Sequence, residues 1–125
     1  MKRILFVFCL LVSFQLMGQV IVDNKDINAD DNIQMIHVSG TWIVGLVKPK
    51  FIFGIDYGQK LESKQFSAKE QIIKDKDGAP QTFNSVMDGI NFLIRNGWAY
   101  VNSYISTGAQ ESFTAHNFIL IKQNK

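Results

Sequence analysis

The sequence predicts an α+β domain in which a four- to five-stranded, mainly antiparallel sheet carries one long helix on one face. One segment repeats apolar residues at helical spacing, and several others alternate apolar and polar residues as strands do. Turn sequences such as Lys48-Pro49-Lys50 and Asp77-Gly78 separate these segments. Two hairpins, one before and one after the helix, should supply the sheet. The alternative is a small open barrel closed by a short strand near Ile72.

Residues 1–18 have the features of a secretory signal segment. Lys2 and Arg3 precede a mostly apolar run from Ile4 to Leu16, which is too short to span a membrane. Gly18 supplies a small residue for cleavage. We therefore expect a secreted or periplasmic protein with no stable membrane insertion after the signal is removed.

Cleavage at this point would change the charge and the chemistry of the chain. It would leave Gln19 or Val20 as the first residue and remove Cys9, the single cysteine, whose place inside the apolar run argues against a lipid anchor. Loss of Lys2 and Arg3 from the 13 basic residues leaves a formally neutral chain, because there are 11 acidic residues. This balance gives no reason to expect nucleic acid binding.

Residues 19–32 form a polar segment that we expect to be a solvated leader, followed by a single domain over residues 33–122. The pattern Asp26-x-Asn28-x-Asp30 matches the opening of a calcium loop. Asp31, however, stands where such a loop needs glycine, and His37 stands where it needs its closing glutamate. We therefore predict no metal site and no cofactor.

The first hairpin is predicted from two segments with strand composition. Residues 33–47 are rich in β-branched and aromatic side chains. In residues 51–57, Phe51, Phe53, Ile55 and Tyr57 alternate with Ile52, Gly54 and Asp56. The turn at residues 48–50 should join them as antiparallel neighbours. Residues 71–74 can add a short further strand.

The helix is predicted from a single apolar stripe, with Thr82 or Asn84 as its N-cap. The stripe consists of Phe83, Val86, Met87, Ile90, Leu93 and Ile94. Gly89 inside this stripe is expected to permit close approach of the helix to the sheet. Gly97 fits the left-handed position that ends many helices, and Trp98 should then pack on Leu93 as a core residue. The alternative is Trp98 as a platform for a ligand.

The second hairpin is predicted from residues 98–106 and 112–122. Alternation places Ala99, Val101 and Ile105 on one face, where their modest size suits packing under the helix. Tyr100, Asn102 and Tyr104 should then project from the opposite face, with Trp98 at the start of the strand. His116 on the last strand can join them, depending on register.

Parts of the sequence resemble a group of small secreted proteins of Gram-negative bacteria. The resemblance rests on the run from Phe83 to Leu93, on Asn96-Gly97-Trp98 and on Val101-Asn102-Ser103-Tyr104, and it spans roughly residues 33–122. The helix, Gly-Trp pair and strand are more distantly similar to a widespread small domain of unknown function. The resemblance implies the fold and an extracytoplasmic location, and it implies no activity.

The composition of the uncovered sheet face favours a non-catalytic binding or protein-interaction module. Aromatic residues flanking polar ones are typical of interfaces, and a protein partner or a homodimer would use this face. Cross-strand packing, or cover by the N-terminal segment, is the structural alternative. The candidate binding residues are Trp98, Tyr100, Asn102, Tyr104 and His116.

Two other functions remain open. A small envelope hydrolase would use His37, Asp56 or His116, although no Ser-His-Asp spacing or glycine-flanked serine supports it. A structural piece would pair with another chain through the face or edge of its sheet. We name no catalytic residue, and the balance of these features leans away from an enzyme.

Overall fold

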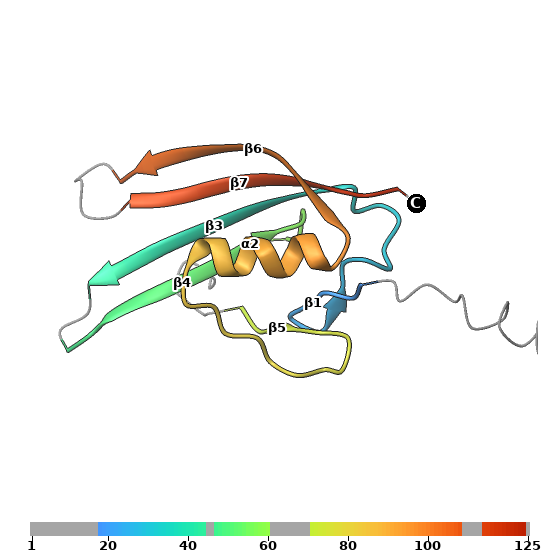
Figure 1. Cartoon of the computed structure of the whole chain (residues 1–125), viewed down its shortest axis with the longest axis horizontal. Helices are drawn as coiled ribbons and strands as arrows, with labels where there is room; N and C mark the ends of the chain where they lie inside the picture. Colours follow the sequence, from blue (N-terminus) through green and yellow to red (C-terminus); the bar gives the residue numbers. More distant parts are fainter. Residues whose placement is uncertain (1–17, 45–46, 61–70, 109–113, 125) are drawn as a thin grey trace, which may run out of the picture.

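The computed structural model describes residues 18–44, 47–60, 71–108 and 114–124. These residues form one helix and two antiparallel sheets, which confirms the predicted α+β class. The larger sheet has four strands in the order β4-β3-β7-β6, and the smaller has three in the order β2-β1-β5. Figure 1 shows the helix in front of the larger sheet, with β1 and β5 below it. The predicted signal segment lies outside the described residues except for Gly18.

Both predicted hairpins are present in the larger sheet. β3 (Met35–Val44) pairs with β4 (Pro49–Asp56), and β6 (Trp98–Thr107) pairs with β7 (Thr114–Lys122). β3 and β7 also pair with each other, so β4 and β6 are the outer strands. Alternating residues on one side of these strands enter the core, among them Ile36, Val38, Phe53, Ile55 and Leu120.

The smaller sheet consists of β1 (Ile21–Val22), β2 (Lys25–Asp26) and β5 (Ile73–Lys74). Asp23 and Asn24 join β1 to β2 with positive φ angles of 48° and 71°. Two-residue hairpin turns need this conformation, and Asp and Asn tolerate it well. β5 pairs with β1 and not with the larger sheet, so the barrel alternative is wrong.

The N-terminal segment differs from the solvated leader that its composition predicts. Val20, Val22 and Ile27 are each 0% exposed and belong to the same core cluster as the helix and the larger sheet. Val20 and Val22 are two residues apart, as the buried positions of a strand are. The surrounding polar residues bond locally, as Asp26 does when its Oδ1 accepts from the backbone N–H of Asn28 at 2.9 Å.

Asn28 ties this segment to the end of the helix. Its Nδ2 donates to the carbonyl oxygens of Gly18 at 2.6 Å and Asn96 at 2.7 Å, and its Oδ1 accepts from Trp98 Nε1 at 2.9 Å. Lys122 Nζ donates to the Asn28 carbonyl at 3.1 Å. One amide side chain therefore bonds both a carbonyl at the helix end and the indole N–H of the core tryptophan.

The helix α2 (Val86–Arg95) begins one residue later than the predicted caps allow. Ser85 is the N-cap, and its Oγ accepts from the backbone N–H of Asp88 at 3.2 Å. Asp88 Oδ2 in turn accepts from the backbone N–H of Asn84 at 3.1 Å. Ser85 caps the helix in place of Thr82 or Asn84 because its hydroxyl reaches the N–H of Asp88, while the Asp88 carboxylate satisfies the preceding N–H of Asn84.

The predicted helix end is confirmed at Gly97. Its φ of +92° lies in the left-handed region, and its N–H donates to the Ile94 carbonyl at 3.2 Å. Trp98 follows at once, is 0% exposed and shares the core cluster with Leu93.

Two glycines allow α2 to lie close to β3 and β4. A Cβ atom at Gly40 would be 2.7 Å from the Cβ of Val86, and a Cβ at Gly89 would overlap the ring of Phe53. Both separations are shorter than van der Waals contact, so neither position accepts a larger residue without movement. The predicted reason for Gly89, close approach to the sheet, is thus confirmed.

We expect Gly89→Ala to destabilise the protein although alanine favours helices. The substitution gains about 1 kcal/mol of helix propensity. Overlap with the buried Phe53 ring should cost about 1–3 kcal/mol, which leaves a net loss of up to about 2 kcal/mol. Urea unfolding measures this difference, with the exposed helix residue Asn91→Ala as a control that should be neutral or slightly stabilising. A Gly89→Ala variant at least as stable as the original would contradict the close packing.

Candidate functional site

The five candidate binding residues do not lie on one surface. Trp98 belongs to the core: it is fully buried, and Lys122 Nζ lies 5.7 Å from the centre of its ring. A ring without exposed surface offers no platform to a ligand. The other four candidates are exposed, and they are divided between the two faces of the larger sheet.

A β-bulge at Val101 divides them. Tyr100 pairs with Leu120 and Asn102 pairs with Ile119, so Val101 is an extra residue in β6. The ring of Tyr100 contacts Phe118 edge-on at 6.4 Å between centroids, on the helix side of the sheet. The prediction that Tyr100 shares a face with Asn102 and Tyr104 is therefore wrong, because simple alternation stops at the bulge.

Tyr104 lies on the face away from the helix, where it joins a polar network across three strands. Its ring stacks on His37 with 6.1 Å between centroids, and its hydroxyl is 3.3 Å from His37 Nε2. His37 Nε2 is also 3.0 Å from Oδ1 of the buried Asn117. Asn117 Nδ2 donates to Ser106 Oγ at 2.9 Å and to the Ala115 carbonyl at 3.1 Å. Since that carbonyl only accepts, the amide is oriented with Oδ1 toward His37, whose Nε2 carries the proton.

The helix was expected to cover β6, and it does not. Val101 and Ile105, which were predicted to lie beneath it, are 49% and 64% exposed. A ten-residue helix is only about 15 Å long. Gly40 and Gly89 allow the helix to pack closely on β3 and β4. Figure 1 shows β6 beyond the upper side of the helix.

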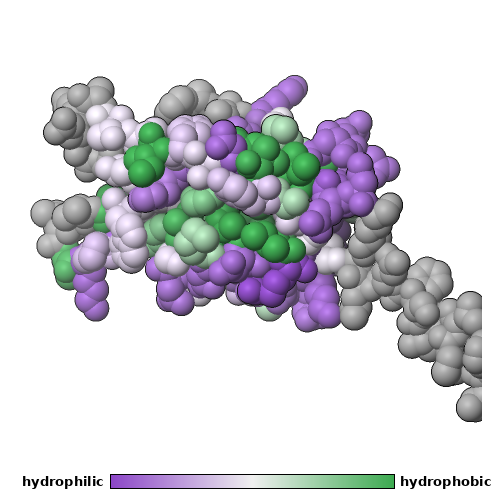
Figure 2. All heavy atoms as spheres, turned by 45° about the horizontal axis from the view of Figure 1, so that its top comes forward, coloured by the Kyte–Doolittle hydropathy of each residue, from purple (hydrophilic) through white to green (hydrophobic). Residues whose placement is uncertain are grey.

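The result is an exposed outer strand whose large side chains lie on both faces of the sheet, and we call these side chains together the β6 surface. Every residue from Tyr100 to Thr107 is exposed. Figure 2 shows apolar side chains gathered in two places over β6 and again over α2, with a paler band between them. The β6 surface comprises Tyr100, Val101, Asn102, Tyr104 and Ile105, of which the four apolar or aromatic members are 49–64% exposed.

The outer backbone edges of the sheet carry side-chain caps. On β6, Asn102 Oδ1 accepts from the backbone N–H of Ser103 at 2.8 Å, directly after the bulge. On β4, Gln71 bonds both the N–H and the carbonyl of Ile55, at 2.6 and 2.8 Å. Bulges and occupied edge groups hinder pairing with a further strand. The β6 surface is thus better suited to contacts through side chains than through backbone.

The three residues of the hydrolase alternative do not assemble into a catalytic group. His116 pairs with Gly40 on the helix side, whereas His37 and Asp56 are cross-strand neighbours on the other side. Asp56 Oδ1 accepts from the backbone N–H of Gly58 at 2.9 Å, and the hydrogen bonds of His37 go to Asn117 and Tyr104. In the described parts of the chain, no carboxylate therefore holds either histidine, as one usually holds a general base.

The residues of the calcium-like pattern are engaged with their own segment. Asp30 Oδ2 lies 2.7 Å from Lys25 Nζ, and this hydrogen bond lowers the pKa of the Asp30 carboxyl below its ordinary value. Within the described parts of the chain, no group of three or more His, Cys, Asp or Glu side chains is arranged to hold a metal ion.

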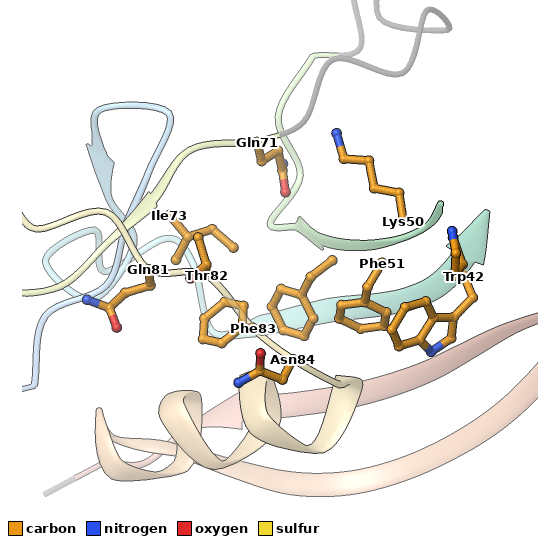
Figure 3. A pocket seen from close by; sticks show the side chains of 11 residues that line it. Trp42, Lys50, Phe51, Gln71, Ile73, Gln81, Thr82, Phe83 and Asn84 are labelled. Carbon is orange, nitrogen blue, oxygen red and sulfur yellow. The ribbon is translucent and has the colours of Figure 1, made fainter. Parts of the chain in front are cut away.

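Sequence reasoning missed an aromatic pocket of about 370 Å³ beside the start of α2. Its rings follow one another at centroid distances of 5.2 Å from Trp42 to Phe51, 6.5 Å from Phe51 to Phe53 and 4.7 Å from Phe53 to Phe83. Figure 3 shows the rings in a row, with Lys50 and Gln71 above them and Asn84 below. The pocket is lined by Trp42, Pro49, Lys50, Phe51, Phe53, Gln71, Ile73, Gln81, Thr82, Phe83 and Asn84.

Trp42 is the residue that could have indicated this pocket from sequence alone. Its alternation with Ile36 and Val38 places it on the helix side of β3, two strand positions beyond Gly40. The structure leaves it 52% exposed, past the start of the helix. A large apolar residue at the end of a row of core-facing residues, beyond the reach of the covering element, can indicate a pocket.

Comparisons with known proteins yield no match among protein-family models, curated proteins or solved structures. The resemblance to small secreted Gram-negative proteins therefore stays a prediction. In the parts of the chain that the structure describes, no helix is long and apolar enough to span a bilayer.

Proposed function

We propose that this protein is a secreted or periplasmic, non-catalytic binding module that contacts a protein partner through the β6 surface. One observation carries the proposal: an ordered outer strand holds Tyr100, Val101, Tyr104 and Ile105 about half exposed or more. A solvated strand is normally polar on its open side. Exposed tyrosines and aliphatic residues around an asparagine instead have the composition of interface cores.

The location rests on the N-terminal sequence. Lys2 and Arg3 before a short apolar run are the features of an export signal. With no cysteine after its signal, such a protein would have to be stable without disulfides. This location is part of the proposal, together with the resemblance to secreted proteins.

The geometry favours this function over the two alternatives. The hydrolase lacks a histidine held by a carboxylate among His37, Asp56 and His116. Strand pairing with another chain is hindered by the bulge at Val101 and the capped N–H of Ser103. Contact through the side chains of the β6 surface needs neither a histidine held by a carboxylate nor free backbone groups at the edge of the strand.

The test is the double variant Tyr100→Ala and Tyr104→Ala. We expect association, whether with a partner or with a second copy, to weaken by about tenfold or more. The melting temperature should fall little, because both side chains are about half exposed. Light scattering reports self-association, and affinity capture followed by titration with the captured partner reports binding to another protein. The single variants then show which face is used, since the bulge places the two rings on opposite faces.

Trp42→Ala is the matched control, because Trp42 is as exposed as Tyr100 and lines the pocket, to which no residue of the β6 surface contributes. It should leave association unchanged. If the double variant unfolds while association of the remaining folded protein is unaltered, the tyrosines are structural and the β6 surface is not the binding site.

A further inference from the structure

We propose that the aromatic pocket is a carbohydrate-binding site that holds one pyranose ring against Trp42 and Phe51. This site is separate from the β6 surface and does not depend on the function proposed for it. The inference rests on the size of the pocket, on its exposed tryptophan, on its polar groups and on the charges of its lining.

The size of the pocket suits a small ring. Ligand sites in proteins usually enclose about 300–1,000 Å³, and this one, at about 370 Å³, is near the lower end. One sugar residue fits such a volume, whereas an extended peptide does not. Trp42 and Pro49 come from the β3–β4 hairpin, and Thr82 to Asn84 from the segment before α2, so the walls belong to two separate parts of the fold.

The floor of the pocket is an aromatic surface that joins the core at one end and is exposed at the other. Phe53 and Phe83 extend the row of rings into the interior, where Phe83 lies 5.5 Å from Phe92. Trp42 lies at the opposite end, 52% exposed and supported on Phe51. The apolar C–H face of a pyranose would cover such a ring and remove apolar surface from water.

The polar groups around the rings match the hydroxyls of a sugar. Gln71 is oriented by its two bonds to the Ile55 backbone, and Gln81 Nε2 by a 2.9 Å bond to Asp75 Oδ2. The side chains of Thr82 and Asn84 make no hydrogen bond to any residue that the structure describes. An amide and a hydroxyl together offer donors and acceptors, which is what vicinal hydroxyl groups require.

The charge of the lining narrows the ligand class further. Among the residues that the structure describes, no Asp or Glu lines the pocket, and Lys50 is the one charged residue in its lining. A cationic ligand would find no countercharge, whereas a neutral or acidic sugar meets no repulsion. The combination of aromatic floor, amides and missing carboxylates therefore points to a carbohydrate.

The test uses the purified protein and two panels of probes. The first panel contains methyl glycosides of glucose, galactose, mannose and N-acetylglucosamine, and the second contains oligosaccharides of the same sugars. Binding is followed by the indole N–H resonances of the two tryptophans. We expect at least one sugar to shift the Trp42 signal in a saturable way while the signal of the buried Trp98 stays in place. Response to methyl glycosides indicates a free sugar as ligand, and response to oligosaccharides alone indicates the end of a glycan.

Variants decide whether the signal comes from the pocket. Trp42→Ala should weaken binding by about tenfold or more, Asn84→Ala should weaken it less, and Tyr100→Ala should leave it unchanged. If Trp42→Ala proves unstable, Trp42→Phe and the protection of Trp42 from acrylamide quenching in the unaltered protein supply the same answer. The proposal is overturned if no sugar of either panel shifts or protects Trp42, or if Trp42→Ala binds as tightly as the original. Loss of protein association in the tyrosine variants with intact sugar binding separates this site from the β6 surface.

Discussion

A chain that begins at Ala29 should fail to fold, whereas one that begins at Gly18 should fold cooperatively. The difference between them is the segment that carries β1 and β2. Val20, Val22 and Ile27 in that segment are completely buried. Removing them would open the side of the core that faces Ile73 and the end of α2.

The expected size of this effect follows from the buried side chains. Each fully buried Val or Ile contributes about 1.5–3 kcal/mol. Three of them together approach the about 5–15 kcal/mol by which a typical domain is stable. The truncation also removes Asn28, which leaves the Trp98 indole N–H without its acceptor.

Circular dichroism and thermal melting of the two chains measure this prediction. A cooperative transition at the same temperature in both chains would show that the N-terminal segment is dispensable. If the signal segment is removed as proposed, we expect a mature N-terminus no later than Val20, because a cut beyond it would break the buried segment. Mass spectrometry of the exported protein from its native host checks that boundary, and an intact Met1 would contradict export.

Trp98→Ala should destabilise the protein by about 3–5 kcal/mol, the range for removing a large buried aromatic side chain. Trp98 is 0% exposed and lies where the helix end, the N-terminal segment and β7 meet. The substitution leaves a cavity and also removes the donor to Asn28 Oδ1. Both losses act in the same direction, so this is the single substitution from which we expect the largest effect.

Urea unfolding of a short variant series separates the two losses. Trp98→Phe keeps much of the ring but removes the indole N–H, and should cost about 1–3 kcal/mol. Asn28→Ala removes the acceptor of this hydrogen bond. Trp98→Phe should therefore lower the free energy of unfolding less in the Asn28→Ala variant than in the unaltered protein. A melting temperature unchanged by Trp98→Ala would place the ring on the surface and revive its candidacy as a ligand platform.

The sequence determined those parts of the fold that depend on spacing along the chain. The helical stripe from Val86 to Ile94, the glycine at position 97 and the two hairpins are all present. Apolar periodicity selects helix or strand before any tertiary contact forms. A left-handed helix end is likewise a local property of glycine, so it could be predicted from one residue.

The buried N-terminal segment was hidden by its composition. Asp23, Asn24, Asp26 and Asn28 suggest solvent, although each has a structural use in a turn or a cap. The alternation of Val20 and Val22 is too short to outweigh them. Their burial depends on β5 and α2, which lie about 50 residues or more further along the chain.

Tertiary structure decided which residues share a face of the sheet and which strand the helix leaves uncovered. Exposure of Tyr100, Asn102 and Tyr104 followed from the sequence, but their common face did not, because the bulge at Val101 depends on the register with β7. Similarly, Gly40 and Gly89 set the helix over β3 and β4, which left β6 uncovered.

The aromatic pocket depends on the same placement. Phe83 belongs to the predicted helical stripe, and Trp42 and Phe51 lie in the two segments predicted to form the first hairpin. They form one wall only because the β3–β4 hairpin extends past the start of α2, and the segment ending at Asn84 turns back toward it. Local periodicity states which face of an element is apolar, but not which element covers that face or how far the cover reaches. How far the helix extends over the sheet depends on close contacts between residues that are far apart in the sequence. Here the helix does not reach Trp42, which stays exposed to solvent.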